Sequence, residues 1–163
     1  MTMRKLLAFL VFSITLGITQ VASAGPLEDG LAAYKRGDYA TALRVWRPLA
    51  DQGDEAAQLL LGVMYDNGQG VTQDYKQAVN WYRKAADQGH PEAQSNLGLK
   101  YANGEGIAQD FKEAVKWFRA AAEQGVPDAQ SNLGVMYAKG QGVLQDYKEA
   151  AKWYRLAATK API

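Results

Sequence analysis

The chain has 163 residues, with 18 Lys and Arg against 17 Asp and Glu, one His and no Cys. Because it lacks the basic excess of nucleic-acid-binding proteins, we do not expect a nucleic-acid partner. The absence of Cys excludes disulfides, thiol nucleophiles and Cys metal sites, and a single His excludes a cluster of His ligands. We therefore expect no cofactor and no metal.

Residues 1–24 are typical of a secretory signal peptide. Arg4 and Lys5 precede an apolar run of 13 residues, and small residues end the segment at Ala24. The run is shorter than the roughly 20 residues that a membrane span needs, although an uncleaved anchor is the alternative. Cleavage after Ala24 leaves 139 residues with a net charge of −1, no membrane span and a periplasmic or secreted location.

Residues 25–56 are predicted to form a first, shorter pair of helices. The connection between them is tight, at about Arg36 and Gly37. Pro48 lies within the second helix and is expected to bend or locally open it, because Pro cannot donate a backbone hydrogen bond. The markers of this pair fall in an order that resembles a tetratricopeptide repeat: Gly30, Ala32, Tyr34, Gly37, Asp38, Tyr39 and Ala42.

A repeat of 36 residues follows, and it divides the rest of the chain into units 57–92, 93–128 and 129–163. The last two units share 20 identities over 35 aligned positions. A fixed period of this length predicts stacked units, each of which buries its apolar side on its neighbours. We therefore predict an all-α protein, an α-α superhelix (solenoid) of about four helix-turn-helix repeats.

Each unit shows helical spacing in two places. In the unit 93–128, Ala93, Leu97 and Tyr101 form one apolar stripe on the first helix. The inward face of the second helix is formed by Phe111, Ala114, Val115, Phe118, Ala121 and Ala122. Gly98 lies inside the first helix, where glycine costs roughly 1 kcal/mol against alanine. Its recurrence as Gly62 and Gly134 indicates that a second helix packs closely there.

The connections within the units also follow simple chemistry. Gly68, Gly104 and Gly140 are placed to end the first helices in the left-handed conformation, and a second glycine lets each loop turn. Val71, Ile107 and Val143 are expected to anchor these loops on the core. Asp74, Asp110 and Asp146 have N-cap spacing, with Gln77, Glu113 and Glu149 completing capping boxes. Pro91 and Pro127 suit the first helical position.

These residues carry a resemblance to a known family. The run A-Q-S-N-L-G-x-x-Y-A-x-G-x-G, followed by Q-D-x-K-E-A and K-W-x-R-x-A-A, resembles the Sel-one-like repeat family of the tetratricopeptide superfamily. The resemblance is strong from Ala57 to Ile163 and looser from Leu27 to Ala56. It implies an α-α superhelix that acts as an adaptor between proteins, and for exported bacterial members a role in the cell envelope.

Two alternatives to an adaptor come from the resemblance and from the aromatic residues. A cysteine-rich exported branch of the family is associated with β-lactam binding or hydrolysis, which implies a β-lactam or cell-wall hydrolase. This chain lacks those cysteines, and no histidine recurs beside Ser95 and Ser131. His90 precedes Pro91 in a turn and is interpreted as solvated, because the partners that a triad needs are missing. We therefore expect no enzymatic activity.

The recurring aromatic residues allow the second alternative, a glycan-binding envelope protein. Trp81, Trp117 and Trp153, with Tyr82, Phe118 and Tyr154, have the spacing of a sugar-binding ladder. The interpretation that we prefer is that they fill the space between helices, where each contributes on the order of 2–3 kcal/mol. A cysteine-free solenoid needs that burial.

The first helices of such units line the concave surface, where repeat proteins usually bind. Positions that change between units are free to serve a partner, which we expect to be another protein or peptide. Asn96 and Asn132 match a position that in related repeats bonds a bound peptide. The predicted protein-binding residues are Leu59, Val63, Asp66, Ser95, Asn96, Leu99, Ala102, Ser131, Asn132 and Val135.

The last helical unit ends close to residue 163, and no polar covering helix is predicted after it. Solenoids normally cover their ends with a polar face. We therefore expect an open apolar edge, at which the protein self-associates weakly or binds a partner. Its residues are Val143, Ala151, Tyr154 and Ala158.

Overall fold

The computed structural model describes residues 25–159, which form α-helices joined by short turns and contain no strand. Consecutive helices pair as a first and a second helix, as the sequence predicts. Their bounds are α1 (Pro26–Lys35), α2 (Tyr39–Asp51), α3 (Glu55–Asn67), α4 (Tyr75–Asp87), α5 (Pro91–Asn103), α6 (Phe111–Glu123), α7 (Pro127–Lys139) and α8 (Tyr147–Thr159).

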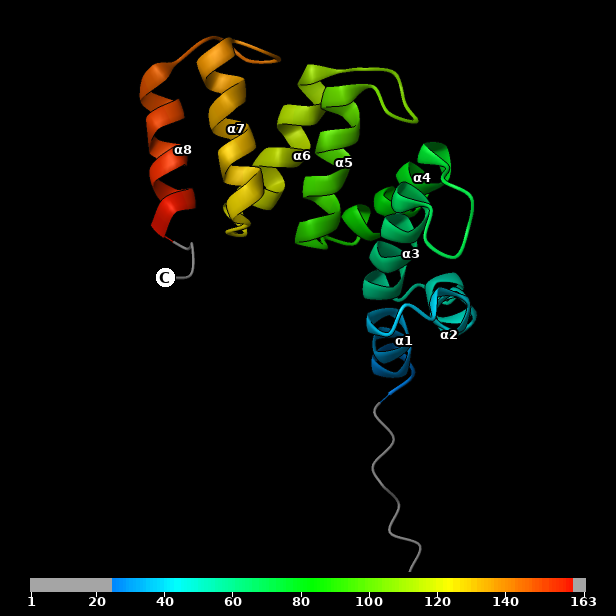
Figure 1. Ribbon diagram of the computed structural model, residues 1–163. Helices are drawn as coiled ribbons and strands as arrows, with labels where there is room; N and C mark the ends of the chain where they lie inside the picture. Colours follow the sequence, from blue (N-terminus) through cyan, green and yellow to red (C-terminus); the bar gives the residue numbers. More distant parts are fainter. Residues whose placement is uncertain (1–24, 160–163) are drawn as a thin grey trace, which may run out of the picture.

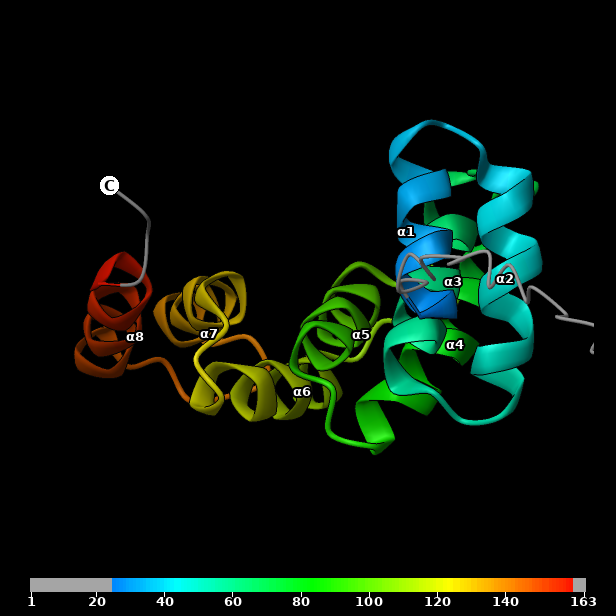
Figure 2. The same ribbon diagram turned by 90° about the horizontal axis from the view of Figure 1, so that it is seen from below.

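The helices stack in chain order along a curved arc (Figure 1). Each helix packs mainly on the helix before it and the helix after it. Seen from below, α1, α5 and α7 lie on the inner side of the curve and α2, α4 and α6 on the outer side (Figure 2). The predicted all-α superhelix is therefore confirmed, and the first helices of the pairs line its concave side.

The first pair has the tight connection that the sequence predicts. α1 ends at Lys35, and α2 begins at Tyr39 after Asp38, whose side chain accepts a hydrogen bond from the Thr41 amide at 3.1 Å. Contrary to the local opening expected at Pro48, α2 continues through this residue to Asp51. Pro48 cannot donate the usual backbone hydrogen bond to the carbonyl four residues earlier. It lies in the last turn of α2, and the three residues that follow it remain helical.

The predicted glycine caps are confirmed. Gly68, Gly104 and Gly140 end their helices with φ of 67°, 73° and 65°, in the left-handed region. The second glycine of each loop has a further role. A Cβ atom on Gly106 would lie 2.3 Å from the backbone of Tyr75 in the preceding pair, so this glycine lets one repeat approach the next.

The aspartate N-caps are confirmed, but the capping boxes are not formed as predicted. Asp110 accepts hydrogen bonds from the amides of Lys112 and Glu113 at 2.9 and 3.1 Å. Its own amide donates at 3.0 Å to the Tyr101 carbonyl of the preceding helix, and is therefore unavailable to the Glu113 side chain. Asp74 and Asp146 repeat this arrangement, so Gln77 and Glu149 do not close boxes either.

Inside each pair, a glycine of the first helix faces an aromatic ring of the second. A Cβ atom built on Gly98 would lie 2.7 Å from the ring of Phe118, which is fully buried. The same contact joins Gly62 to Tyr82 and Gly134 to Tyr154. The close approach that the recurring glycine predicted is therefore present in every 36-residue unit.

The tryptophans of the second helices are core residues, in agreement with the interpretation that they fill the space between helices. Trp81, Trp117 and Trp153 are 3%, 9% and 7% exposed. Tyr82 and Phe118 are equally buried, whereas Tyr154 of the last helix is 41% exposed. A bound sugar has no access to indole faces at this depth, so the residues proposed for a ladder are used for packing.

Successive pairs are joined by a repeated set of polar contacts. The Nε2 atom of Gln94 in α5 donates to the Ala86 carbonyl of α4 at 3.3 Å, and Gln130 bonds Ala122 in the same way at 3.0 Å. Beside them, an arginine of each second helix bonds a tyrosine hydroxyl of the next first helix: Arg47 to Tyr65, Arg83 to Tyr101 and Arg119 to Tyr137. Each junction is thus built from one repeated pattern.

Among residues 25–159 no helix is long and apolar enough to cross a membrane. The predicted signal peptide of residues 1–24, with its cleavage site, lies outside the described residues.

The substitution Gly98→Ala tests the glycine–aromatic contact. Alanine is normally the better helix former by about 1 kcal/mol. Here the added methyl group would collide with the Phe118 ring, and overpacking of this kind costs about 1–3 kcal/mol. We expect Gly98→Ala to lower the free energy of unfolding by up to about 2 kcal/mol in urea denaturation followed by circular dichroism, once the gain in helix propensity is subtracted.

The variant Phe118→Leu provides the control, because the smaller side chain leaves room for the methyl group. In that background Gly98→Ala should cost clearly less. A higher urea midpoint for Gly98→Ala in the wild-type background would contradict the packing argument.

Candidate protein-binding surface

The predicted binding residues of α3 are Leu59, Val63 and Asp66. Leu59 and Val63 are half-buried, and each also packs against the apolar core of the following pairs. Their outer surfaces remain available to a ligand. Two apolar side chains of α3 are therefore packed on the core and partly exposed at the same time.

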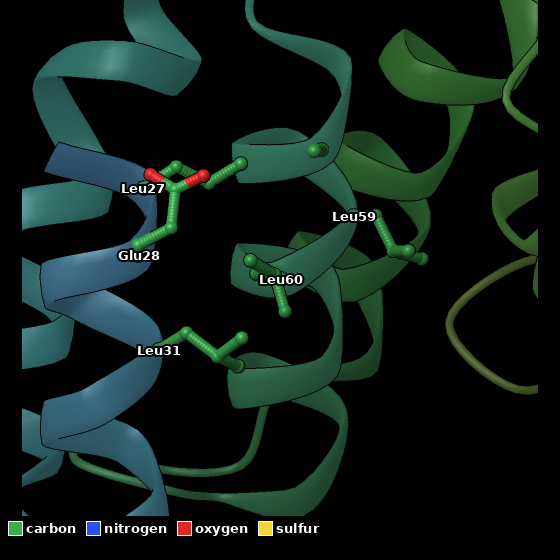
Figure 3. A pocket seen from close by; sticks show the side chains of 6 residues that line it. Leu27, Glu28, Leu31, Leu59 and Leu60 are labelled. Atoms are coloured by element: carbon green, nitrogen blue, oxygen red, sulfur yellow. The ribbon is translucent and has the colours of Figure 1, made fainter. Parts of the chain in front are cut away.

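An apolar pocket of about 210 Å³ lies between α1 and α3 (Figure 3). Its lining is almost entirely aliphatic, with one carboxylate at the rim, and comprises Leu27, Glu28, Leu31, Ala56, Leu59 and Leu60. Only Leu59 was among the predicted binding residues. The α1 residues were missed because the first pair does not follow the 36-residue period, so no comparison between units marked them as variable.

On α5 the predicted residues divide into two groups. Leu99 is 40% exposed and Asn96 is partly exposed, so both are accessible to a partner. Ser95 and Ala102 are only 7% and 9% exposed. These two positions therefore contribute little area to a binding surface, because variation between units marks a helix face without showing how deeply a neighbour covers it.

On α7, Ser131, Asn132 and Val135 are all partly exposed. The side-chain amides of Asn132 and Asn96 form no hydrogen bond with another residue in the range 25–159, so their donors and acceptors are free for a ligand. The inner surface is defined here as the pocket between α1 and α3 together with Val63, Asn96, Leu99, Ser131, Asn132 and Val135.

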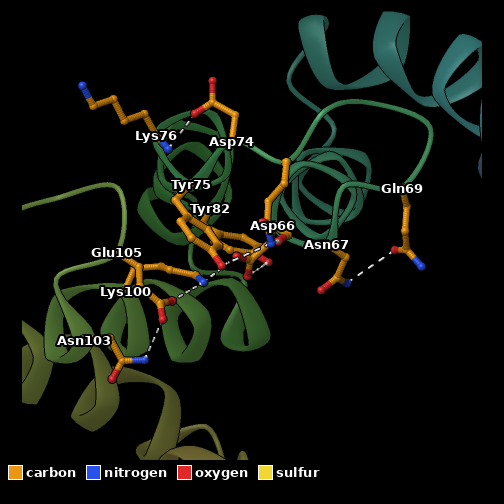
Figure 4. Close-up of polar contacts among 11 residues, drawn as sticks. Asp66, Asn67, Gln69, Asp74, Tyr75, Lys76, Tyr82, Lys100, Asn103 and Glu105 are labelled. Carbon is orange, nitrogen blue, oxygen red and sulfur yellow. Dashed lines mark hydrogen bonds and ion pairs between the residues drawn. The ribbon is translucent and has the colours of Figure 1, made fainter.

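Asp66, the remaining predicted residue, belongs to a charged cluster that the sequence did not predict. Its Oδ1 atom lies 2.5 Å from Nζ of Lys100, which also bonds Oε2 of Glu105 at 2.7 Å. The Tyr82 hydroxyl donates to Asp66 Oδ2 at 3.1 Å, and the Lys100 ammonium lies 4.7 Å from the centre of the Tyr75 ring (Figure 4). Asp66 is therefore engaged in joining α3 to α5.

The surroundings of this cluster keep its groups in fixed charge states. Burial alone would lower the pKa of Lys100, but its hydrogen bonds with Asp66 and Glu105 outweigh that effect and raise the pKa above its ordinary value. The hydrogen bond from Lys100 lowers the pKa of Glu105. Burial, together with Asp66, raises the pKa of Tyr82 well above its ordinary range. Lys100 thus remains a cation and Tyr82 a neutral donor near neutral pH.

The signal for the cluster was present in the repeat alignment. Asp66, Lys100 and Glu105 all depart from their equivalents in the next pairs, where Ala102, Met136 and Gln141 stand at the same junction positions. Three departures at one junction indicate one interaction, but only the structure shows that they meet.

The candidates for catalysis do not assemble into a site. His90 is not a solvated turn residue, because its side chain is only 16% exposed and its Nδ1 atom lies 3.3 Å from Oε2 of Glu92. It occupies the N-cap of α5, and Ser95 is buried within that helix. Within residues 25–159 there is also no group of three His, Asp or Glu side chains placed to hold a metal ion.

The profile of the Sel1 repeat family matches the chain three times, over residues 55–90, 91–126 and 127–161. Each matched repeat begins two residues before the corresponding predicted unit, at the start of a first helix. No curated protein matches the chain significantly.

Solved structures give a consistent result. A protective antigen present in uropathogenic Escherichia coli strains, which displays an SLR fold, is similar with a TM-score of 0.80 and 46% identity, over 84% of this chain and 30% of that one. A Sel1 repeat protein from Oxalobacter formigenes follows with a TM-score of 0.78 and 43% identity, over 82% of this chain and 55% of that one. The chain therefore spans about a third and about half of the lengths of these two proteins.

A more distant neighbour shares the fold alone. The cysteine rich protein B of Helicobacter pylori has a TM-score of 0.52 and 22% identity, over 66% of this chain and 96% of that one. The present chain has no cysteine.

A double-mutant cycle tests the charged cluster. Lys100→Met leaves Asp66 and Glu105 without their cation, and Asp66→Ala removes one anion from a buried ammonium. The double variant carries the residues found at the α5–α7 junction. We expect each single variant to be less stable in urea unfolding, and the double variant to recover part of that loss, with a coupling energy of about 1–2 kcal/mol.

The matched control is the cycle at Glu113 and Lys116, an exposed pair at 3.4 Å on the surface of α6. Its coupling should be below about 0.5 kcal/mol. Equal coupling energies at the two sites would show that the Lys100 cluster is an ordinary surface interaction.

Proposed function

Because the chain belongs to the Sel1 repeat family, we propose that it is a scaffold that binds a segment of another protein on its inner surface. Proteins built from Sel1 repeats generally mediate protein–protein interaction and are typically non-catalytic. The proposal adds the location of the binding surface and the kind of ligand.

The observation that carries the proposal is the apolar pocket between α1 and α3. Ligand sites are concave, mostly apolar and supplied with a few polar groups, and this pocket combines five aliphatic side chains with the carboxylate of Glu28. Its size suits a large apolar side chain. Such an anchor, buried near the centre of an interface, commonly provides most of the binding energy.

The rest of the inner surface supplies a path for the remainder of the ligand. Leu99 offers an exposed apolar contact on α5, and Val135 offers a half-buried one on α7. The free amides of Asn96 and Asn132 can each donate to and accept from a peptide backbone. We infer that the ligand is a peptide segment with one large apolar residue for the pocket and backbone groups for the two asparagines.

The proposed location is the periplasm or the exterior of the cell. It is supported by the basic start, short apolar run and small residues of the first 24 residues. In a bacterial cell envelope, a scaffold of this type would bring envelope proteins together.

Export is tested by expressing the full chain in a Gram-negative host and fractionating the cells. We expect the periplasmic or culture fraction to contain a product whose intact mass corresponds to residues 25–163. The variant Leu10→Arg, which interrupts the apolar run, should retain the full-length chain in the cytoplasm. Cytoplasmic full-length protein from the wild-type gene would contradict the proposed location and would leave the binding proposal intact.

Binding is tested with Leu31→Asp and Leu99→Asp, which place a charge at two exposed positions of the inner surface. Affinity capture from native cell extract identifies candidate partners, and the purified partner is then titrated by calorimetry. We expect each variant to weaken binding at least tenfold, a loss of about 1.4 kcal/mol or more.

Leu144→Asp is the control, because Leu144 is 91% exposed in the loop before α8 and lies outside the inner surface. It should bind like the wild type. A partner that binds Leu31→Asp and Leu99→Asp normally would show that the inner surface is not the binding site.

A further inference from the structure

The face of α3 that lines the pocket has counterparts on α5 and α7, because the chain repeats every 36 residues. On α3 this face consists of Ala56, Leu59 and Leu60. The residues at the same positions of the next two first helices are Glu92, Ser95 and Asn96 on α5 and Asp128, Ser131 and Asn132 on α7. The face thus changes along the arc from aliphatic to polar, and it gains one carboxylate on each of the two later helices.

The carboxylates near this face receive little neutralisation from cations of the described chain. Glu28 at the pocket rim, Glu92 and Asp128 are all exposed. Between residues 25 and 159, Glu28 and Asp128 form no ion pair, and Glu92 meets only the imidazole of His90 at 3.3 Å. Lys139, the basic residue in the last turn of α7, lies about three helical turns from Asp128, roughly 16 Å along the helix. That distance exceeds the Debye length of about 8 Å at physiological salt, so this lysine is largely screened from Asp128.

The helix dipole explains why acids occur at these helix starts, but not why they occupy this face. Glu92 and Asp128 lie in the first turns of α5 and α7, where the dipole stabilises an anion. α3 meets the same requirement with Glu55, which stands one residue before Ala56 and therefore about 100° away from the pocket face. An acid off the face is thus compatible with the fold, and its place on the face in α5 and α7 adds negative charge to the inner surface.

On the basis of the proposed peptide-binding function, we infer that the segment bound on the inner surface is basic as well as apolar. Its large apolar residue occupies the pocket between α1 and α3, beside Glu28. Lys or Arg residues on one side of this anchor contact first Glu92 and then Asp128, since α5 follows α3 and α7 follows α5 along the arc (Figure 1). Charge complementarity that extends over several helices selects a peptide over a small cation, because only a peptide reaches all of these carboxylates.

The test uses the full chain and three labelled peptides, which share a central phenylalanine and differ in the residues on both sides of it: lysine, glutamine or glutamate. Fluorescence anisotropy should show saturable binding of the lysine peptide, at least about tenfold tighter than that of the glutamine peptide, since each of several exposed ion pairs contributes about two- to fivefold. The glutamate peptide should not saturate. Replacing the phenylalanine of the lysine peptide by alanine should weaken binding by about tenfold or more, because the pocket loses its anchor.

Glu92→Gln and Asp128→Asn remove the charges with little change of shape. Each variant should weaken binding of the lysine peptide about two- to fivefold and leave binding of the glutamine peptide unchanged. Glu113→Gln is the matched control, because Glu113 is also a carboxylate in the first turn of its helix but belongs to α6, on the outer side of the arc (Figure 2). This variant should bind both peptides like the wild type.

The outcomes separate this inference from the function on which it rests. The preference for a basic segment is overturned if the glutamine or glutamate peptide binds as tightly as the lysine peptide, whereas weaker binding of all peptides by Leu31→Asp would still support the pocket as a peptide site. Lysine-peptide binding that Leu31→Asp leaves unchanged would contradict the pocket itself, and with it the proposed function. The inference is also overturned if no peptide saturates, or if the protein sediments as a dimer that Asp128→Lys dissociates, because the occupant would then be a second copy of this chain.

Discussion

The contact between a helical glycine and an aromatic ring holds each pair of helices together at close range. Gly98 has no side chain to separate α5 from α6, so the ring of Phe118 lies directly on its backbone. The ring is completely buried. Since the chain has no disulfide, this dense apolar packing, repeated along the arc, supplies the cohesion of the fold.

The arrangement also explains how the inner surface can be variable. Packing depends on residues that recur in every unit, and these face the second helices. Exposed positions of α5 and α7 are released from that requirement, so they carry Leu99 and Asn132 without cost to the stack. A repeat protein can in this way keep its architecture while it changes its ligand.

Much of the fold follows from sequence periodicity, because each unit meets the same environment. Glycine caps, aspartate N-caps and the buried tryptophans were predicted correctly from spacing alone. The capping boxes failed for a non-local reason, since the amide of Asp110 bonds the Tyr101 carbonyl of another helix. The pocket at Leu31 was not predicted, because α1 is shorter than the other helices and does not align with the 36-residue repeat. The burial of Ser95 and the contact between Asp66 and Lys100 depend on how adjacent pairs are rotated relative to each other. No local sequence pattern determines that rotation.

The cluster around Lys100 has a mechanical consequence for the curvature of the arc. At the junction between the second and third pairs, a charged hydrogen bond joins Lys100 of α5 to Asp66 of α3, and a second one fixes Lys100 to Glu105 in the loop after α5. Such bonds resist sliding because they are directional. At the next junction the equivalent side chains, Ala102 and Met136, cannot form a charged hydrogen bond, and the directional contacts are those that every junction shares. The junction between α3 and α5 should therefore resist rotation more than the junction between α5 and α7, so that bending of the superhelix on binding a ligand should be larger between the third and fourth pairs.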